Sequence, residues 1–227
     1  MTKQKNLQVL SIDCIIYSFH SDKLKILLVK HAEGLSAGKW AIPGGYIMKD
    51  EDIDDAAVRI LNLHTGLKDI YLEQLKAFGA ADRYPTRRVI TISYFALARY
   101  DEVKLEPGKS VLEVKWHPLG EHPNLIFDHN EILDFGINRL RHIVRHEPIG
   151  FNLLPEKFTF LQLQTLYEAI LDTHFDKPNF RRKFSKMKLL IDTNTKQKNV
   201  SHRAANLYRF DMQVYKKLKE KGFSFDL

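Results

Sequence analysis

The sequence predicts an α+β protein in two parts, a strand-rich domain of residues 1–147 and a helical, basic domain of residues 148–227. Three observations support this. Short apolar runs separated by turn residues dominate as far as residue 116, with one strong helical pattern between them. Pro and Gly follow each other closely within residues 147–150. Beyond residue 150 the chain holds 15 Lys and Arg against 8 Asp and Glu, which accounts for the whole net charge of +7.

Five β-strands are expected in the first domain, because each run is rich in β-branched or aromatic residues and ends at turn residues. They cover residues 7–18, 25–30, 70–78, 89–98 and 111–116. A turn at residues 21–23 pairs the first two strands. The lone Cys14 lies among isoleucines in the first strand and is expected to be a small buried side chain.

Two helices are expected among these strands. From Ile53 onward, apolar residues recur at spacings of three and four, and Gly66 is a natural C-terminal stop. The second helix covers residues 130–146, with Asp128 or His129 as its cap. The order of strands, helix, strands and closing helix predicts a layered domain with helices packed on a sheet.

Residues 155–210 are predicted to form a winged helix-turn-helix. Thr159 and Gln162 have the spacing of a capping box and begin the first helix. After a short turn, Asp176 caps a second helix that extends to Met187. Its apolar stripe consists of Phe180, Phe184 and Met187. An apolar stripe opposite basic side chains is the division that a DNA recognition helix needs.

The candidate DNA-binding residues follow from this pattern. In the second helix they are Lys177, Asn179, Arg181, Arg182, Lys183 and Lys186, and in the loop that follows they are Lys198 and Arg203. Strands at residues 189–191 and 207–210 would flank this loop, which also holds His202, in the layout of a wing that contacts the DNA backbone or minor groove. The alternative is a surface helix with solvated charges. The basic tail at residues 216–221 either adds phosphate contacts or is a solvated end.

Residues 45–67 resemble the Nudix box, G-x5-E-x7-R-E-U-x-E-E-x-G-U, in which U is a bulky aliphatic residue. The matching residues are Gly45, Glu51, Arg59, Leu61, Gly66 and Leu67. The three glutamates of the core are replaced by Ile60, Leu63 and His64. Mg²⁺ needs carboxylate oxygens, so the chain lacks the cluster with which Nudix hydrolases hold metal, and neither a metal site nor a cofactor is expected. Glu51 and Arg59 are expected to form a scaffold ion pair, the alternative being a residual metal ligand and its partner.

A Nudix-like domain followed by a winged helix is similar to the family of Nudix-related transcriptional regulators, which act on NAD metabolism or sugar utilisation. In the second domain the similarity rests on residues 151–159, 163–169 and 176–183. The resemblance implies a Nudix α/β/α sandwich that senses an effector without cleaving it. It also implies a homodimeric repressor whose partner is double-stranded DNA. The expected effector is a sugar such as arabinose or a nucleotide sugar such as ADP-ribose.

The resemblance also implies the effector-binding residues. They are Trp40 and Phe78, as stacking or wall residues, and Arg83, Arg87 and Arg88, in a loop that is similar to one near the ligand in this family. Arginines suit an anionic nucleotide, whereas the complete loss of the metal site favours a neutral sugar. Both effectors stay open at this point.

Two alternatives to a non-catalytic regulator remain. One is an active Nudix hydrolase of ADP-ribose-type substrates that takes its metal-binding carboxylates from another loop. The other is a regulator with weak residual hydrolysis. Ile60, Leu63 and His64 argue against the first of these. The sequence shows no signal-peptide pattern and no apolar run of membrane length, so a cytoplasmic protein with no membrane partner is expected.

Overall fold

The computed structural model describes residues 9–67, 71–105, 107, 110–198 and 203–227. These residues form two compact units. The first unit consists of Met1–Ser18 and Lys25–Asn138, and the second consists of Phe19–Leu24 and Arg139–Leu227. Nudix-like and winged-helix features lie in different units.

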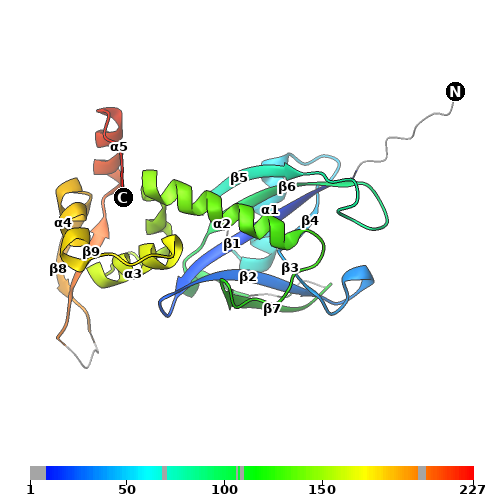
Figure 1. Ribbon diagram of the computed structural model, residues 1–227, viewed down its shortest axis with the longest axis horizontal. Coiled ribbons are helices and arrows are strands. Elements are labelled where there is room, and N and C mark those ends of the chain that lie inside the picture. The colour runs from blue at the N-terminus through cyan, green and yellow to red at the C-terminus, as the bar shows by residue number, and fades with distance from the viewer. Residues whose placement is uncertain (1–8, 68–70, 106, 108–109, 199–202) are drawn as a thin grey trace. The chain divides into compact units, whose positions relative to one another are not determined.

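A mixed β-sheet forms the centre of the first unit (Figure 1). Its strands are β1 (Val9–His20), β2 (Lys23–His31), β3 (Trp40–Ala41), β4 (Gly44–Tyr46), β5 (Tyr71–Phe78), β6 (Val89–Leu97) and β7 (Val111–Pro118). The main path runs β3-β2-β1-β6-β5, with β4 paired to β1 and β7 paired to β2. β1 and β6 are parallel, and the paired register runs from Val9 with Val89 to Tyr17 with Leu97.

Two helices cover the sheet on opposite faces in Figure 1. They are α1 (Ile53–Thr65) and the part of α2 (His129–His146) that belongs to this unit, which ends at Asn138. Side chains alternate across a strand, so β1 serves both layers. Ile12, Cys14 and Ile16 belong to the core that contains the buried side of α1. The opposite face meets α2 at Gly136, where a Cβ atom would lie 2.2 Å from the Ile15 side chain. Only glycine permits this close approach.

The strands and helices expected in the first domain are confirmed, with small differences at their ends. Ser21 and Asp22 both adopt left-handed backbone conformations, which suit the tight turn between β1 and β2. Residues 7 and 70, at which two of the predicted strands begin, lie outside the described residues. Cys14 is fully buried, and this burial raises the pKa of its thiol to about 12.

The second unit contains a helix pair followed by a two-stranded antiparallel sheet. Its elements after α2 are the 3-10 helix η3 (Pro148–Leu153), α3 (Phe160–Leu171), α4 (Lys177–Met187), β8 (Leu190–Lys196), β9 (Asn206–Phe210) and α5 (Met212–Glu220). Thr159 and Gln162 form the expected capping box at the start of α3. Asp176 caps α4 by accepting a hydrogen bond from the Asn179 backbone N–H at 3.0 Å. These caps confirm the predicted helix starts.

An aromatic core supports the second unit. Phe184 is fully buried, and its ring lies within 4.7–6.3 Å of the rings of Phe151, Tyr167, Phe180 and Phe225. The turn between α3 and α4 is fixed by polar contacts. Glu168 Oε1 accepts from the Phe175 N–H at 2.8 Å, and Gln164 Nε2 donates to the Phe175 carbonyl at 2.9 Å. The orientation of α4 therefore depends on both apolar packing and a hydrogen-bonded turn.

The basic tail, for which phosphate contacts and a solvated end were both open, forms a helix that was not predicted, and its four lysines are exposed. The N-terminus of this helix, α5, is capped by Asp211 through the backbone N–H groups of Gln213 and Val214. Tyr215 is buried, with its ring 6.1 Å from that of Phe210. The helix was missed because the run of lysines masked a capped helical pattern.

In the described part of the chain, no helix is long and apolar enough to cross a membrane.

Candidate functional site

Residues 44–52, the Nudix-like loop, lead from β4 into α1 and are held by one bidentate ion pair. Arg59 donates to Glu51 from Nε at 2.6 Å and from Nη2 at 2.8 Å. It also donates to the Tyr46 carbonyl at 2.9 Å, while Glu51 accepts from the Met48 N–H at 3.1 Å. The Arg59 hydrogen bonds lower the pKa of Glu51 to about 2. The carboxylate therefore joins the loop at Met48 to α1 at Arg59, as expected for a scaffold ion pair.

The three residues that replace the glutamates lie in different environments along α1. Ile60 and His64 are buried in the first unit, whereas Leu63 is 53% exposed. The His64 Nδ1 atom is buried without a hydrogen-bond partner. Among the described residues, no group of three or more His, Cys, Asp or Glu side chains is placed to hold a metal ion.

Burial lowers the pKa of His64 to about 4, and His31 acts in the same direction. We therefore expect stability to fall as the pH drops. The unfolded chain binds a proton near pH 6.5, while the folded chain resists protonation until about pH 4, so stability is full above that window. The loss is about 3 kcal/mol between pH 7.5 and pH 4.

Denaturant unfolding of the wild type and of His64→Leu, followed by tryptophan fluorescence, measures this effect. Trp40 and Trp116 both belong to the first unit and are the two tryptophans of the chain, so the signal reports that unit alone. The leucine variant should lose most of the pH dependence. An unchanged slope in that variant would assign the effect to His31 and His117, whose pKa values burial also lowers.

A cavity of about 300 Å³ opens beside the Nudix-like loop. Its walls come from β1, the η1 turn (Gly34–Ser36), β4, the loop before β6 and the segment before α2. The polar side chains that line it are Ser11, Asp13, His31, Glu33, Ser36, Tyr46, Arg83, Tyr84 and His129. Ile42, Val89, Ile126 and Phe127 add apolar walls. Concave sites with a few convergent polar groups are typical ligand sites.

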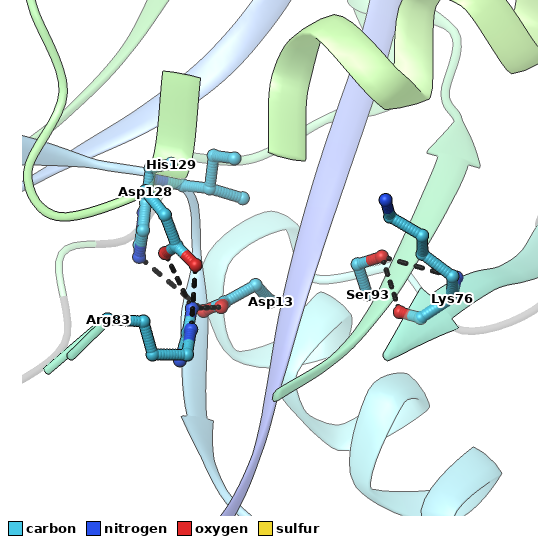
Figure 2. Close-up of polar contacts among 7 residues, drawn as sticks. Asp13, Lys76, Arg83, Ser93, Asp128 and His129 are labelled. Atoms are coloured by element: carbon cyan, nitrogen blue, oxygen red, sulfur yellow. Dashed lines mark hydrogen bonds and ion pairs between the residues drawn. The ribbon is translucent and has the colours of Figure 1, made fainter. Parts of the chain in front are cut away.

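A buried charged cluster forms part of this wall (Figure 2). Arg83 makes a bidentate pair with Asp128, donating from Nε and Nη2 at 2.7 Å each. Its Nη2 lies 3.4 Å from Asp13, and His129 Nε2 lies 3.9 Å from the other oxygen of Asp13. His129 Nδ1 accepts from the Ile42 N–H at 3.0 Å. Figure 2 also shows Ser93, which donates to the Lys76 carbonyl at 2.9 Å beside the irregularity in β5.

Aromatic side chains form another part of the wall. The Tyr84 ring lies 4.9 Å from that of Phe127. Arg87 donates to the Tyr46 hydroxyl at 2.6 Å, and its guanidinium lies 5.1 Å from the Tyr46 ring and 5.6 Å from the Tyr84 ring. The arginine therefore organises two cavity tyrosines from outside the cavity lining. This arrangement offers flat apolar faces beside a positive charge.

The predicted effector residues do not all meet at the cavity. Arg83 lines it, and Arg87 contacts two of its tyrosines. Trp40 instead packs edge-on against His117 at 4.8 Å, and Phe78 is buried against Phe135 at 6.1 Å. Arg88 donates to the Ala80 carbonyl at 2.6 Å. Asp13, Tyr46, Tyr84 and His129 were not among the predicted residues, although they line the cavity.

The predicted recognition helix presents its charges to solvent. Phe180 and Phe184 are buried, whereas the predicted DNA-binding residues of α4 are all exposed. Arg182 donates from Nη2 to the Asn179 side-chain oxygen at 2.7 Å, and the Arg181 guanidinium lies 4.9 Å from the Phe160 ring. The division into an apolar face and a basic face is the one the sequence predicted.

The predicted wing has longer strands than expected. β8 continues to Lys196, so the loop is shorter than predicted. Lys198 and Arg203 are exposed on either side of residues 199–202, and His202 lies outside the described residues. β9 also pairs, through Tyr208, with Phe158 just before α3. The strand pair is therefore joined directly to the helix pair.

Two family models match this chain, one in its first part and one in its last part. A model described as the NUDIX domain matches residues 8–135. A model described as the NrtR DNA-binding winged helix domain matches residues 150–210. The two matches together cover most of the chain and account for both parts of the fold.

Individual relatives are similar to this chain over most of its length. The ADPR responsive transcriptional repressor NtrR of Acinetobacter baylyi is 31% identical over 211 residues, which cover 91% of this chain and 84% of that protein. NrtR of Shewanella oneidensis, crystallised with a 27mer DNA, has a TM-score of 0.80 and 28% identity, covering 96% of this chain and 99% of that one. Its NUDIX domain, crystallised with ADP ribose, has a TM-score of 0.55 and 31% identity, covering 62% and 93% respectively.

Proposed function

We propose, since this chain belongs to the NrtR-type Nudix-related transcriptional regulators, that it is a repressor whose DNA affinity responds to ADP-ribose. Residues 1–147 form the sensing domain and residues 148–227 the DNA-binding domain. The observation that carries the proposal is a cavity of ligand size lined by β4, in a chain whose following helix lacks the three Nudix glutamates. Such a site binds a diphosphate compound without the metal cluster that would cleave it.

The relatives favour a nucleotide effector over a neutral sugar. The Acinetobacter baylyi repressor is described as ADPR responsive, and the Shewanella oneidensis NUDIX domain was crystallised with ADP ribose. None of the three relatives reported above is described as binding arabinose. The tyrosines of the cavity and Arg87 suit a stacked base and a nearby anionic group. We therefore prefer ADP-ribose to arabinose.

Regulation requires that the effector bind two states of the protein with different affinity. We propose a homodimer in which α4 of each subunit enters one major-groove half-site, and Lys198 and Arg203 contact the backbone. Effector binding in the sensing domain changes the separation of the two recognition helices. A two-fold dimer reads a palindromic operator, so a small change in separation weakens both half-sites together.

Fluorescence anisotropy on DNA from upstream of the gene, with random DNA as control, tests the proposal. We expect tight, selective binding that ADP-ribose changes by about 5- to 150-fold, which is the usual range of allosteric coupling. L-arabinose and D-xylose serve as matched sugar controls. Equal binding to both DNAs that collapses with salt would contradict specific recognition, because phosphate contacts alone behave in this way.

The hydrolase alternative is tested with the same protein. ADP-ribose and Mg²⁺ are incubated with the full chain, and released AMP is measured against a buffer blank. We expect no turnover at ordinary enzymatic rates. A rate near 1 per second or above would restore the enzyme hypothesis.

A further inference from the structure

We propose that Asp13 and His129 form a diol-binding subsite in the cavity, where they bind two adjacent hydroxyl groups of a furanose ring. The inference deepens the proposed function, because it rests on the same cavity as the effector site. It does not depend on which furanose occupies that site. Both residues line the cavity, and each side chain carries hydrogen-bonding capacity that the protein leaves unused.

Asp13 is a buried carboxylate with weak partners. It is 6% exposed, and its two contacts within the described residues are with Arg83 at 3.4 Å and His129 at 3.9 Å. Arg83 makes its short bonds elsewhere, at 2.7 Å to both oxygens of Asp128. A carboxylate has about four acceptor sites. A buried charge without short hydrogen bonds is costly, so a ligand donor at Asp13 offsets that cost.

His129 supplies the complementary donor. It is 6% exposed, and its Nδ1 accepts a hydrogen bond from the Ile42 backbone N–H at 3.0 Å. In the neutral ring the proton must then lie on Nε2. This N–H lies 3.9 Å from Asp13 Oδ1, beyond hydrogen-bond distance. Asp13 Oδ1 and His129 Nε2–H therefore stand side by side in the cavity wall, and among the described residues neither atom makes a hydrogen bond (Figure 2).

Adjacent hydroxyl groups match this pair. One hydroxyl donates to Asp13, and its neighbour accepts from His129 Nε2–H, because each hydroxyl both donates and accepts. Carboxylates bind ribose hydroxyls in dinucleotide-binding folds for the same reason. A phosphate does not fit, since the Asp13 carboxylate repels it and Arg83 is already paired with Asp128. The subsite therefore selects the sugar and not the diphosphate.

The test is a titration of full-length Asp13→Asn and wild type with three ligands. ADP-ribose carries two ribose diols, ADP carries one, and 2′,3′-dideoxy-ADP carries none. A charged acceptor binds a hydroxyl more strongly than an amide does, so we expect the variant to bind the diol-bearing ligand about tenfold more weakly. Binding of 2′,3′-dideoxy-ADP should not change. If the variant loses affinity for ADP-ribose alone, the distal ribose occupies the subsite. If it loses affinity for ADP as well, the nucleoside ribose occupies the subsite.

Asp101→Asn is the matched control. Asp101 is an exposed carboxylate of the first unit, in the 3-10 helix η2 (Tyr100–Glu102), and it does not line the cavity, so the same substitution there should leave the ligand series unchanged. The wild type alone also tests the diol. If the subsite binds the nucleoside ribose, 2′,3′-dideoxy-ADP must bind more weakly than ADP. If it binds the distal ribose, ADP must bind more weakly than ADP-ribose. The subsite would be overturned if Asp13→Asn lost affinity for all three ligands equally, or if the wild type bound all three ligands with equal affinity.

The subsite is separable from the proposed effector. If the wild type binds no nucleotide, the proposed function fails, and the same variants are titrated with L-arabinose and D-ribose 5-phosphate. Binding of either compound that Asp13→Asn weakens and Asp101→Asn does not would support the subsite. If neither compound binds the wild type, the subsite is refuted with the effector.

Discussion

Replacement of Arg182 by alanine is expected to abolish selective operator binding while leaving effector binding intact. A bidentate contact from arginine to a guanine edge contributes about 1–3 kcal/mol of discrimination, or roughly 5- to 150-fold for each half-site. In a two-fold dimer both half-sites lose the contact, so the effects combine. The helix itself should survive, because Arg182 is exposed and α4 is anchored by Phe180 and Phe184.

The geometry of Arg182 favours a base contact over a phosphate contact. Its guanidinium is held by the Asn179 side-chain oxygen at 2.7 Å, which orients it near the start of α4. The N-terminal residues of recognition helices are those that usually meet bases. A base contact should change the selectivity between operator and random DNA with little change in the salt slope. A phosphate contact would weaken both DNAs alike and reduce the slope by about 1.

Arg145→Ala is the matched control for Arg182→Ala. Arg145 is an exposed arginine of the same unit, on α2, and donates to the Arg141 carbonyl at 3.2 Å. Its loss removes the same charge without touching α4. Anisotropy on operator and random DNA over a salt series compares the three proteins. If Arg182→Ala binds the operator as the wild type does, α4 does not read bases through this residue.

The second domain was largely predictable because its structure is specified locally. The capping box at Thr159, the cap at Asp176 and the apolar stripe of α4 involve residues close together in the chain, and each formed as the sequence indicated. The helix α5 follows the same rules, with Asp211 as cap and Tyr215 on its buried side. It was overlooked because charge was given more weight than helical spacing.

The cavity was less predictable because it is assembled from distant segments. Asp13 lies within an apolar strand, and nothing local distinguishes it from a chance polar residue. Its role appears only when β1, the loop of Arg83 and the start of α2 come together, across up to 115 positions between Asp13 and Asp128. Trp40 and Phe78 failed to reach the cavity for a related reason. An aromatic residue in a strand packs against whichever element covers its face.

The Ile60→Glu substitution should destabilise the first unit by at least about 4 kcal/mol. Ile60 is 1% exposed and belongs to the apolar core. Its side chain packs so close to Gly45 that a Cβ atom added to this glycine would lie 3.5 Å from Ile60 Cδ1. A glutamate there buries a charge among apolar side chains without a partner, which is among the most costly single changes. Denaturant unfolding followed through Trp40 and Trp116 measures the loss in this unit alone.

Leu63→Glu separates burial from charge. It introduces the same side chain three residues further along α1, at a residue that is 53% exposed, so stability should change by less than about 0.5 kcal/mol. Leu63 can therefore accept the glutamate of the Nudix pattern at little cost in stability, whereas Ile60 contributes to the core. If Ile60→Glu proved as stable as Leu63→Glu, the core would tolerate the carboxylate. If Ile60→Glu unfolds the unit, restoring the Nudix glutamates requires repacking the domain.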